Sequence, residues 1–404
     1  MPQVAVRAAF YRGGTSRAVV FREADLAVYG ARAQEAIILA ALGSPDPHGR
    51  EIDGLGGGIS SLSKVAIVGP APAGSGADVT YRFGQVDVEH PAVEFMGTCG
   101  NISAAIGPFA IDEGMLAPRE PVTPVRVLAV NTGQYYVCHV PVRAGRAEVE
   151  GDYTIDGVPS PGARIRLEFL EPGGTLGRGL LPTGRTRETV ELEDGRAVEV
   201  SIVDAGNPIV FLRAADLGAT GSERPEEIDA NRPLCETLDA VRDEAAVRVG
   251  LASSPAEARQ RSKAIPKVVM VAPPASYETT GGSRVSRGDA DVLARMLSMS
   301  RAHRTLAATA GFCTAVAASI DETLVGEIAR PRLDPGRVLR IGHAAGVLEI
   351  GASVESGSEG WHVRSISTYR TARRIMDGQV YVPERYLSGE AWYQRVREAV
   401  AATG

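Results

Sequence analysis

The chain has 404 residues, of which 44% are hydrophobic and 23% charged, a composition typical of folded globular domains rather than of disordered chains. Its formal net charge of −6 argues against a nucleic-acid-binding surface, and the absence of a long apolar run argues against a membrane span or a signal peptide. Four cysteines without a CxxC pair argue against a disulfide framework or a zinc site. We therefore expect a cytoplasmic protein of about two domains that holds no metal and binds neither nucleic acid nor membrane.

Short β-rich runs dominate the chain and are separated by turn signals. In chain order they cover 4–10, 18–21, 64–68, 125–130, 135–140, 164–170, 197–203, 267–272, 347–354 and 361–368. Four helices are expected among them: two amphipathic segments at 25–43 and 288–303, and two apolar segments that begin near 101 and 312. The small residues of the last two helices suit burial on all sides rather than a solvent-facing position.

Three short markers occur twice, in the same order, which predicts an internal duplication. They are GTSRAVVF (14–21) with GNPIVFL (206–212), KVAIVGP (64–70) with KVVMVAP (267–273), and TCGNISA (98–104) with TAGFCTA (309–315). Each unit would be a mixed, strand-rich layer around one buried helix, which is an α+β fold. The first domain would cover 1–190 and the second 191–375, and we expect the C-terminal segment 376–404 to pack back on the first domain.

Cys99 lies just before the first of the two apolar helices, in the tetrapeptide TCGN. The free N–H groups and the macrodipole of a helix N-terminus favour an anion there and lower the pKa of a neighbouring thiol. Gly100 would let a ligand approach the backbone closely. The alternative is that Cys99 is a small buried apolar residue, which is the commonest role of a free cysteine. The second copy has Ala310 at this position, which argues against a mechanism with two symmetric thiols.

Lys64 closes the loop GLGGGISSLSK, and it is one of only three lysines in the chain, the others being Lys263 and Lys267. Glycines and hydroxyls such as those of Ser61 and Ser63 can form a nest for an anion. The loop runs into a strand, so it is neither a Walker A loop nor a dinucleotide-binding loop. At a buried position an amine can lose its proton and act as a base, which arginine cannot do. The alternative is a flexible hairpin with an exposed lysine.

The segment RGGTSR (12–17) places two arginines and two hydroxyls around a Gly-Gly turn. Arg17 could bind a carboxylate with its guanidinium fork, beside the hydroxyl of Ser16. The alternative is a solvated turn. His303 and His343 receive no role, because a lone histidine is more often structural than catalytic, and no histidine–carboxylate cluster has the spacing of metal ligands.

Taken together, these motifs resemble the PrpF family of cofactor-independent isomerases and tautomerases of unsaturated di- and tricarboxylates, which includes methylaconitate isomerase and oxalomesaconate tautomerase. The resemblance extends from residue 10 to 384 and adds HRTLAATAGFCTAVAA, IGHAAG and RTARRIMDGQVYVP to the motifs above. Two motifs depart from the family pattern: Arg17 stands where MRGGTSK has lysine, and GHAAG replaces GHPSG. Both departures bear on the substrate.

The resemblance implies a diaminopimelate epimerase-like fold, with two pseudo-symmetric domains and the substrate between the two helix N-termini. It implies that Lys64 is the base and that Cys99 lies in the site. Cys99 is our candidate for the second acid, and the alternative is that it only lines the site. The same positions make Gly100, Asn101, Thr309 and Gly311 candidate binding residues, together with Lys267 as the counterpart of Lys64.

The expected reaction is a 1,3-allylic proton shift in an unsaturated polycarboxylate of the aconitate, methylaconitate or oxalomesaconate type, without a metal or redox cofactor. The alternative is a non-catalytic protein that uses the same scaffold to bind a polycarboxylate or a partner enzyme. An epimerase with two catalytic cysteines is excluded by Ala310. The only partner we expect is the small-molecule substrate, and the sequence leaves open whether the chain forms a homodimer.

Overall fold

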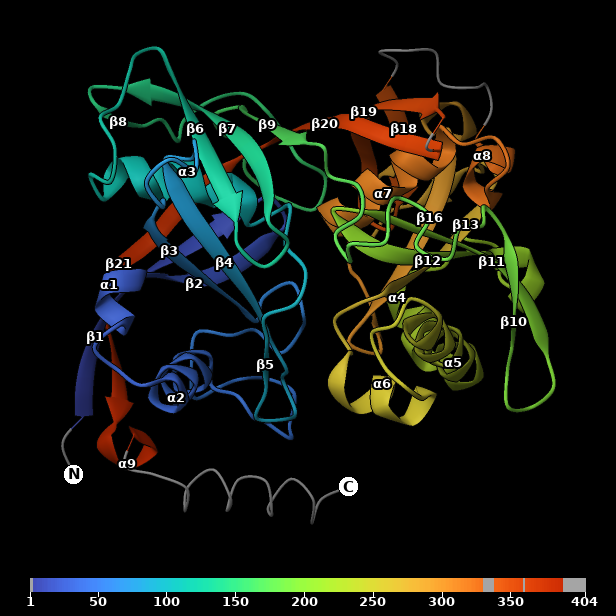
Figure 1. The fold of residues 1–404 in the computed structure, drawn as a ribbon, viewed down its shortest axis with the longest axis horizontal. Helices are drawn as coiled ribbons and strands as arrows, with labels where there is room; N and C mark the ends of the chain where they lie inside the picture. Colours follow the sequence, from blue (N-terminus) through green and yellow to red (C-terminus); the bar gives the residue numbers. More distant parts are fainter. Residues whose placement is uncertain (1–2, 330–337, 359, 388–404) are drawn as a thin grey trace.

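The computed structural model describes residues 3–329, 338–358 and 360–387, and strands are its most abundant regular element (Figure 1). The strands of the first half are β1 (Gln3–Gly13), β2 (Ser16–Arg22), β3 (Lys64–Pro70), β4 (Val79–Val86), β5 (Val93–Glu94), β6 (Val122–Ala129), β7 (Gln134–Arg143), β8 (Arg146–Ala147) and β9 (Ile165–Leu170). Its helices are α1 (Glu23–Leu26), α2 (Ala31–Leu42) and α3 (Ser103–Asp112).

The second half follows with its own strands and helices. The strands are β10 (Glu188–Glu191), β11 (Ala197–Ala205), β12 (Asn207–Arg213), β13 (Lys267–Ala272), β14 (Tyr277–Glu278), β15 (Arg284–Val285), β16 (Val292–Ser298), β17 (Arg301–Ala302), β18 (Val338–His343), β19 (Gly346–Gly357), β20 (Gly360–Arg370) and β21 (Ala372–Pro383). The helices are η1 (Ala214–Leu217), α4 (Pro225–Ala230), α5 (Arg232–Arg248), α6 (Pro255–Arg261), η2 (Arg287–Asp289), α7 (Ala308–Ala318), α8 (Leu324–Ile328) and α9 (Glu384–Leu387).

Both halves pair their strands in the same order. In the first half β1 and β2 form an antiparallel hairpin, β3 runs parallel to β2, β4 is antiparallel to β3, β6 is parallel to β4, and β7 and β9 follow in antiparallel order. In the second half β11, β12, β13, β16, β18, β19 and β20 repeat this sequence of directions. The predicted α+β fold with two pseudo-symmetric units is therefore confirmed.

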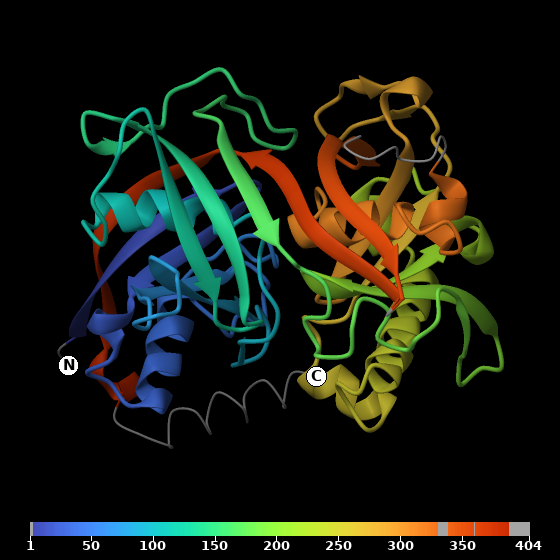
Figure 2. The same cartoon turned by 45° about the horizontal axis from the view of Figure 1, so that its top comes forward.

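The last two long strands connect the halves. β20 pairs with β19 on one side and with β9 on the other, and Figure 2 shows this red strand crossing between the halves. After Thr371 the chain returns to the first half, where β21 pairs with β1 from Gln3↔Pro383 to Gly13↔Ala372. Residues 388–404 of the expected C-terminal segment lie outside the described residues. The division of the chain at residue 190 stays a prediction, and it falls within β10.

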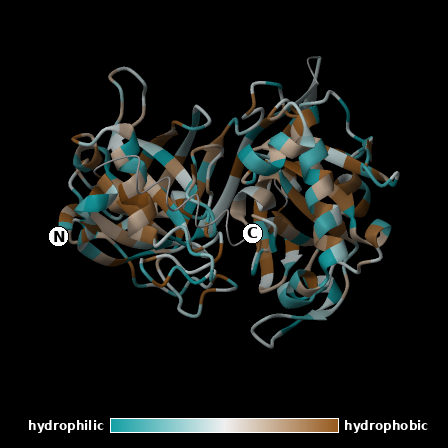
Figure 3. Cartoon of the chain, turned by 90° about the horizontal axis from the view of Figure 1, so that it is seen from below, coloured by the Kyte–Doolittle hydropathy of each residue, from teal (hydrophilic) through white to brown (hydrophobic). Residues whose placement is uncertain are grey.

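Each half encloses one apolar helix. Every residue of α7 is buried, and in α3 all residues from Ser103 to Ile111 are buried. Small side chains let the sheet approach these helices closely: a Cβ at Gly107 would lie 2.6 Å from a methyl group of Val140. Hydrophobic segments gather inside each half, whereas α2 and α5 cover the outer faces (Figures 1 and 3). The N-termini of α3 and α7, the two enclosed helices, meet between the halves.

The prediction of a helix at 288–303 is wrong. The structure places η2, β16 and β17 there, and β16 pairs with β13, β17 and β18. All seven residues of β16 are buried, so the strand lacks the alternation of apolar and polar residues that identifies a half-exposed strand. The helix expected at 25–43 is interrupted, because α1 ends at Leu26 and Gly30 caps the start of α2.

Candidate functional site

A small closed cavity lies between the two halves, where β3 and β13 begin and where α3 and α7 have their N-termini. We call it the lysine cavity. Its free volume is about 20 Å³, which is roughly the space of one water molecule. Its polar lining consists of Ser16, Lys64, Gln85, Thr98, Cys99, Asn101, Asn207, Lys267, Ser298, His303 and Thr309.

Lys64 is the first residue of β3, and its side chain is buried in this cavity. The amine donates a hydrogen bond to Gln85 Oε1 at 2.5 Å and lies 5.3 Å from the ring centre of Phe83. Gln85 is oriented by its amide nitrogen, which donates to the carbonyls of Ser60 and Ser63 at 3.0 Å each. Burial lowers the pKa of the Lys64 ammonium, while a negative charge on Cys99 would raise it. The neutral amine, which is the form that can accept a proton, is thereby more accessible than in an exposed lysine.

Lys267 is the first residue of β13, the strand that corresponds to β3. Its amine donates to the carbonyl of Ala264 at 2.8 Å. Burial and the positive charge of Lys64 lower the pKa of Lys267 to about 8. At pH 7 Lys267 therefore remains mostly protonated, and it brings a cation into the cavity.

Asn207 joins the two halves at the floor of the cavity. Its side chain forms a pair of hydrogen bonds with the backbone of Thr98, each 2.9 Å long, one accepted from the N–H and one donated to the carbonyl. The same amide nitrogen lies 3.3 Å from Thr309 Oγ1. The hydroxyl of Thr98 is buried without a hydrogen-bond partner, although it lines the cavity. An oxygen-bearing ligand would supply that partner.

Asn101 and His303 also line the lysine cavity. Asn101 Nδ2 donates to Thr15 Oγ1 at 3.0 Å, and its Oδ1 accepts from Arg370 Nε at 3.0 Å. Burial and the charge of Lys64 lower the pKa of His303 to about 3, so its ring is neutral at pH 7. Its Nδ1 accepts the backbone N–H of Thr305 at 3.2 Å, which leaves the ring proton on Nε2.

The charge balance of the lysine cavity selects for an anion. Two amines line it, and no aspartate or glutamate does among the described residues. The dipoles of α3 and α7, whose N-terminal ends lie at the cavity, add positive potential from both sides. Because a buried charge without a counter-charge is costly, the arrangement is complementary to a ligand that carries carboxylates.

The structure brings six of the predicted site residues together in this cavity. They are Ser16, Lys64, Cys99, Asn101, Lys267 and Thr309. Cys99 is buried, and its carbonyl accepts both the hydroxyl and the backbone N–H of Ser103 in the first turn of α3, which fixes the position of the thiol beside the helix start.

Arg17 does not line the cavity. Successive side chains of a strand point to opposite faces, so Ser16 faces the cavity and Arg17 lies on the other face of β2, with its guanidinium 5.4 Å from the ring centre of Phe10. Ser61 and Ser63 do not line the cavity either. The Ser63 hydroxyl donates to Glu51 and to the carbonyl of Ile59, and the backbone carbonyl of Ser61 accepts the N–H of Arg17. Their part in binding stays a prediction.

The two predicted glycines pack between elements. A Cβ at Gly100 would lie 2.8 Å from the ring of Phe312 and 3.0 Å from Ala308, so this position allows the two helix starts to touch. A Cβ at Gly311 would lie 2.7 Å from a methyl group of Leu348. Neither glycine lines the cavity.

Sequence reasoning missed Gln85, Thr98, Asn207, Ser298 and His303 as cavity residues. The sequence did contain a signal for Asn207, because this residue follows Gly206, the first residue of a repeated marker. Gln85 had none, since it is one of several polar residues in an otherwise ordinary strand.

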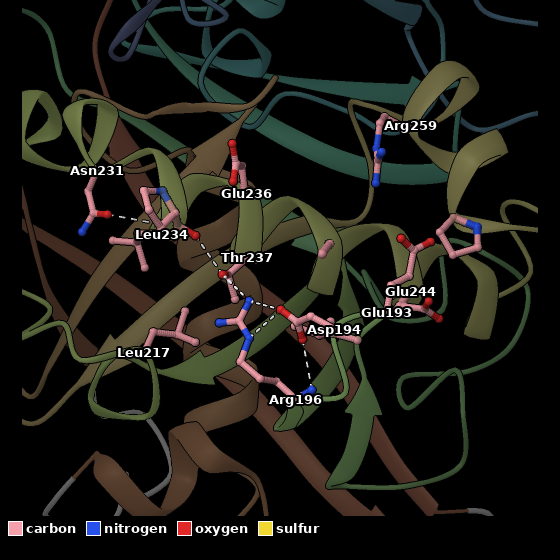
Figure 4. A pocket seen from close by; sticks show the side chains of 14 residues that line it. Glu193, Asp194, Arg196, Leu217, Asn231, Leu234, Glu236, Thr237, Glu244 and Arg259 are labelled. Atoms are coloured by element: carbon pink, nitrogen blue, oxygen red, sulfur yellow. Dashed lines mark hydrogen bonds and ion pairs between the residues drawn. The ribbon is translucent and has the colours of Figure 1, made fainter.

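A second cavity, of about 550 Å³, lies on the outer side of the second half between the β10–β11 turn and α5 (Figure 4). Asp194 and Arg196 form an ion pair of 2.6 Å there, and Arg196 also donates to Thr237 at 3.0 Å. The groove contains charges of both signs and none of the predicted site residues. It therefore lacks the concentration of buried cations found in the lysine cavity.

Comparisons with known proteins show similarity over nearly the whole chain. A family model described as PrpF protein matches residues 3–383. The 3-methylitaconate isomerase of Eubacterium barkeri is 38% identical over 386 residues, which cover 95% of this chain and 99% of the relative. The 2-methyl-aconitate isomerase of Shewanella oneidensis (strain MR-1) is 36% identical over 393 residues, which cover 95% of this chain and 98% of the relative.

Solved structures give the same result for the fold. A crystal structure of methylitaconate-delta-isomerase superposes with a TM-score of 0.75 at 37% identity, and the match covers 97% of this chain and 99% of that one. A hydroxyproline epimerase from Agrobacterium vitis, with a TM-score of 0.55 at 14% identity, covers 94% of this chain and 93% of its own and shares the fold alone. The diaminopimelate epimerase-like fold is thereby confirmed. In the described residues, no helix is both long and apolar enough to cross a membrane.

Proposed function

Because the chain belongs to the PrpF family and is an isomerase, we propose that it moves a double bond within an unsaturated di- or tricarboxylate by a 1,3-allylic proton shift in the lysine cavity. The observation that carries this proposal is the pair of buried amines in a cavity without a carboxylate. One amine is available as a base, and the other is a cation suited to a substrate carboxylate.

The neutral amine of Lys64 takes a proton from the carbon α or γ to a carboxylate and becomes an ammonium. The electron pair of the broken C–H bond spreads over the allylic system and the carboxylate as a dienolate. Lys267 and the positive ends of the α3 and α7 dipoles stabilise the negative charge that develops. These groups are fixed before the reaction, so little reorganisation is needed.

Cys99 returns a proton to the other end of the allylic system and is left as a thiolate. The Lys64 ammonium then protonates the thiolate, which restores both groups and completes the cycle without net gain or loss of protons. The position of both side chains in the lining of one small cavity supports this pairing. His303 cannot share the acid role at neutral pH, because its ring is neutral at that pH and is not the imidazolium that would give up a proton.

The alternative is a non-catalytic protein that binds a polycarboxylate on the same scaffold. The two are distinguished by incubating the protein in heavy water with trans-aconitate, 2-methyl-aconitate and 3-methylitaconate and following deuterium incorporation by NMR. We expect exchange at an allylic carbon of at least one acid, together with formation of its isomer. Binding of these acids without any exchange would favour the alternative.

A further inference from the structure

A third cavity, which we call the arginine cavity, adjoins the lysine cavity on the far side of Asn101. It has a volume of about 310 Å³, within the range of small-molecule sites. Its buried end is formed by Asn101, His343 and Arg370, and its exposed end by Thr154, Asp156 and Glu349. Of these residues, only Asn101 belongs to the site of the proposed proton shift, where it forms part of the wall of the lysine cavity.

Arg370 is 3% exposed and has no carboxylate partner among the described residues. Its Nε donates to Asn101 Oδ1 at 3.0 Å, and its Nη1 donates to Thr368 Oγ1 at 3.0 Å and to the carbonyl of Tyr369 at 2.7 Å. All three acceptors are neutral, and Nη2 keeps both of its N–H groups free. Burial of this cation without a counter-charge lowers its pKa to about 10, so the guanidinium is still charged at neutral pH.

Two further donors line the same cavity. The Nδ1 atom of His343 accepts the N–H of Ala345 at 3.2 Å, and burial keeps the ring neutral by lowering its pKa to about 3. The ring proton is therefore on Nε2, which has no other partner in the described residues. The hydroxyl of Tyr153 is likewise unbonded, and it lies close enough to Arg370 for the guanidinium to act on its pKa. The buried end thus offers several donors and one uncompensated positive charge.

The exposed end of the arginine cavity offers carboxylates instead of donors. Glu349 is exposed, and its carboxylate forms no hydrogen bond or ion pair within the described residues. Asp156 accepts the backbone N–H of Val347 with one carboxylate oxygen, at 2.6 Å, and keeps the other oxygen free. A ligand that fits both ends has a carboxylate at one end and a hydroxyl or an ammonium group at the other.

We infer that the arginine cavity is a second ligand site, which binds a small carboxylate through Arg370 and directs a hydroxyl or ammonium group of that ligand toward Asp156 and Glu349. A carboxylate matches the free N–H groups of a guanidinium in geometry and in charge. This inference does not depend on the proposed proton shift, because the site would exist in a protein without catalytic activity.

The test is saturation-transfer NMR with L-serine and L-lactate as probes, on the full chain and on matched variants. Thr154→Trp fills the exposed end from the rim without altering Arg370. Ser160→Trp adds the same side chain at an exposed residue of the same loop that does not line the cavity. Arg370→Lys keeps the charge but removes the planar fork.

We expect at least one probe to bind the unmodified chain and the Ser160→Trp variant equally well. Thr154→Trp should abolish binding, and Arg370→Lys should weaken it at least tenfold. The inference is overturned if neither probe binds, or if binding survives Thr154→Trp unchanged. It is also overturned if the probes protect the Cys99 thiol from alkylation, because they would then occupy the lysine cavity.

Discussion

Lys64 and Lys267 occupy the same position in the two halves of the molecule: each is the first residue of a strand that runs parallel to the second strand of the preceding hairpin, and both amines reach one cavity. Duplication has thus brought two amines together in a buried site. When Lys64 is protonated, as after it accepts the substrate proton, its charge lowers the pKa of Lys267, and an anionic ligand would relieve the repulsion.

The Lys267 ammonium predicts a loss of activity at alkaline pH. The free enzyme binds a carboxylate best while Lys267 is protonated, so kcat/KM should fall as pH rises through about 8. Lys267→Arg keeps a positive charge at every accessible pH, and in this variant the alkaline limb should disappear. The measurement is a pH profile of kcat/KM for the unmodified enzyme and for Lys267→Arg. An unchanged alkaline limb in Lys267→Arg would assign that limb to another group.

The Cys99 thiol should be protected by ligands of the lysine cavity. The cavity has space for about one water molecule, so the halves must separate to admit either a substrate or an alkylating reagent. Saturating trans-aconitate should slow the alkylation of Cys99 by iodoacetamide at least tenfold, as followed by mass spectrometry. Cys235 is partly exposed on α5 and serves as an internal control whose rate should not change. Equal slowing of both thiols would show an effect that is not local to the cavity.

Asn207 should contribute more to stability than its size suggests. Replacing it with alanine leaves the buried N–H and carbonyl of Thr98 without partners, at a cost of about 1–3 kcal/mol for each group. The comparison is Asn231→Ala, which removes the exposed N-cap of α5 and should cost about 1 kcal/mol. Urea unfolding measures both free energies. A smaller loss for Asn207→Ala than for Asn231→Ala would contradict the role of this clamp.

The sequence predicted the duplication and most of the charged site because these depend on local signals. A lysine retained in an arginine-rich chain and a cysteine before a small-residue helix are visible without knowledge of the fold. The orientation of Arg17 was not predictable in the same way, since neighbouring strand residues face opposite sides and only the register decides which side is the cavity. Gln85 and His303 come from separate halves, and only the packing of the halves reveals that they share a wall.

Strand β16 was mistaken for a helix for a related reason. A strand buried on both faces has no periodic polar positions, so its apolar residues fit a helical pattern equally well. The lysine at the start of β13 was nevertheless placed correctly, because it follows from the repeat rather than from the secondary structure of its neighbours.

The most direct test of the central claim is proton exchange by Lys64→Arg, measured by NMR in heavy water with whichever acid the unmodified enzyme isomerises. Arginine keeps the charge but cannot accept the proton at neutral pH, so exchange should fall by roughly 10²–10⁴-fold while substrate binding changes little. Lys263→Arg is the matched control, because this third lysine lies outside the lysine cavity, 3.5 Å from Asp87, and its variant should exchange at the normal rate. If Lys64→Arg retains most of its exchange rate and loses only affinity, Lys64 is a binding cation and not the base.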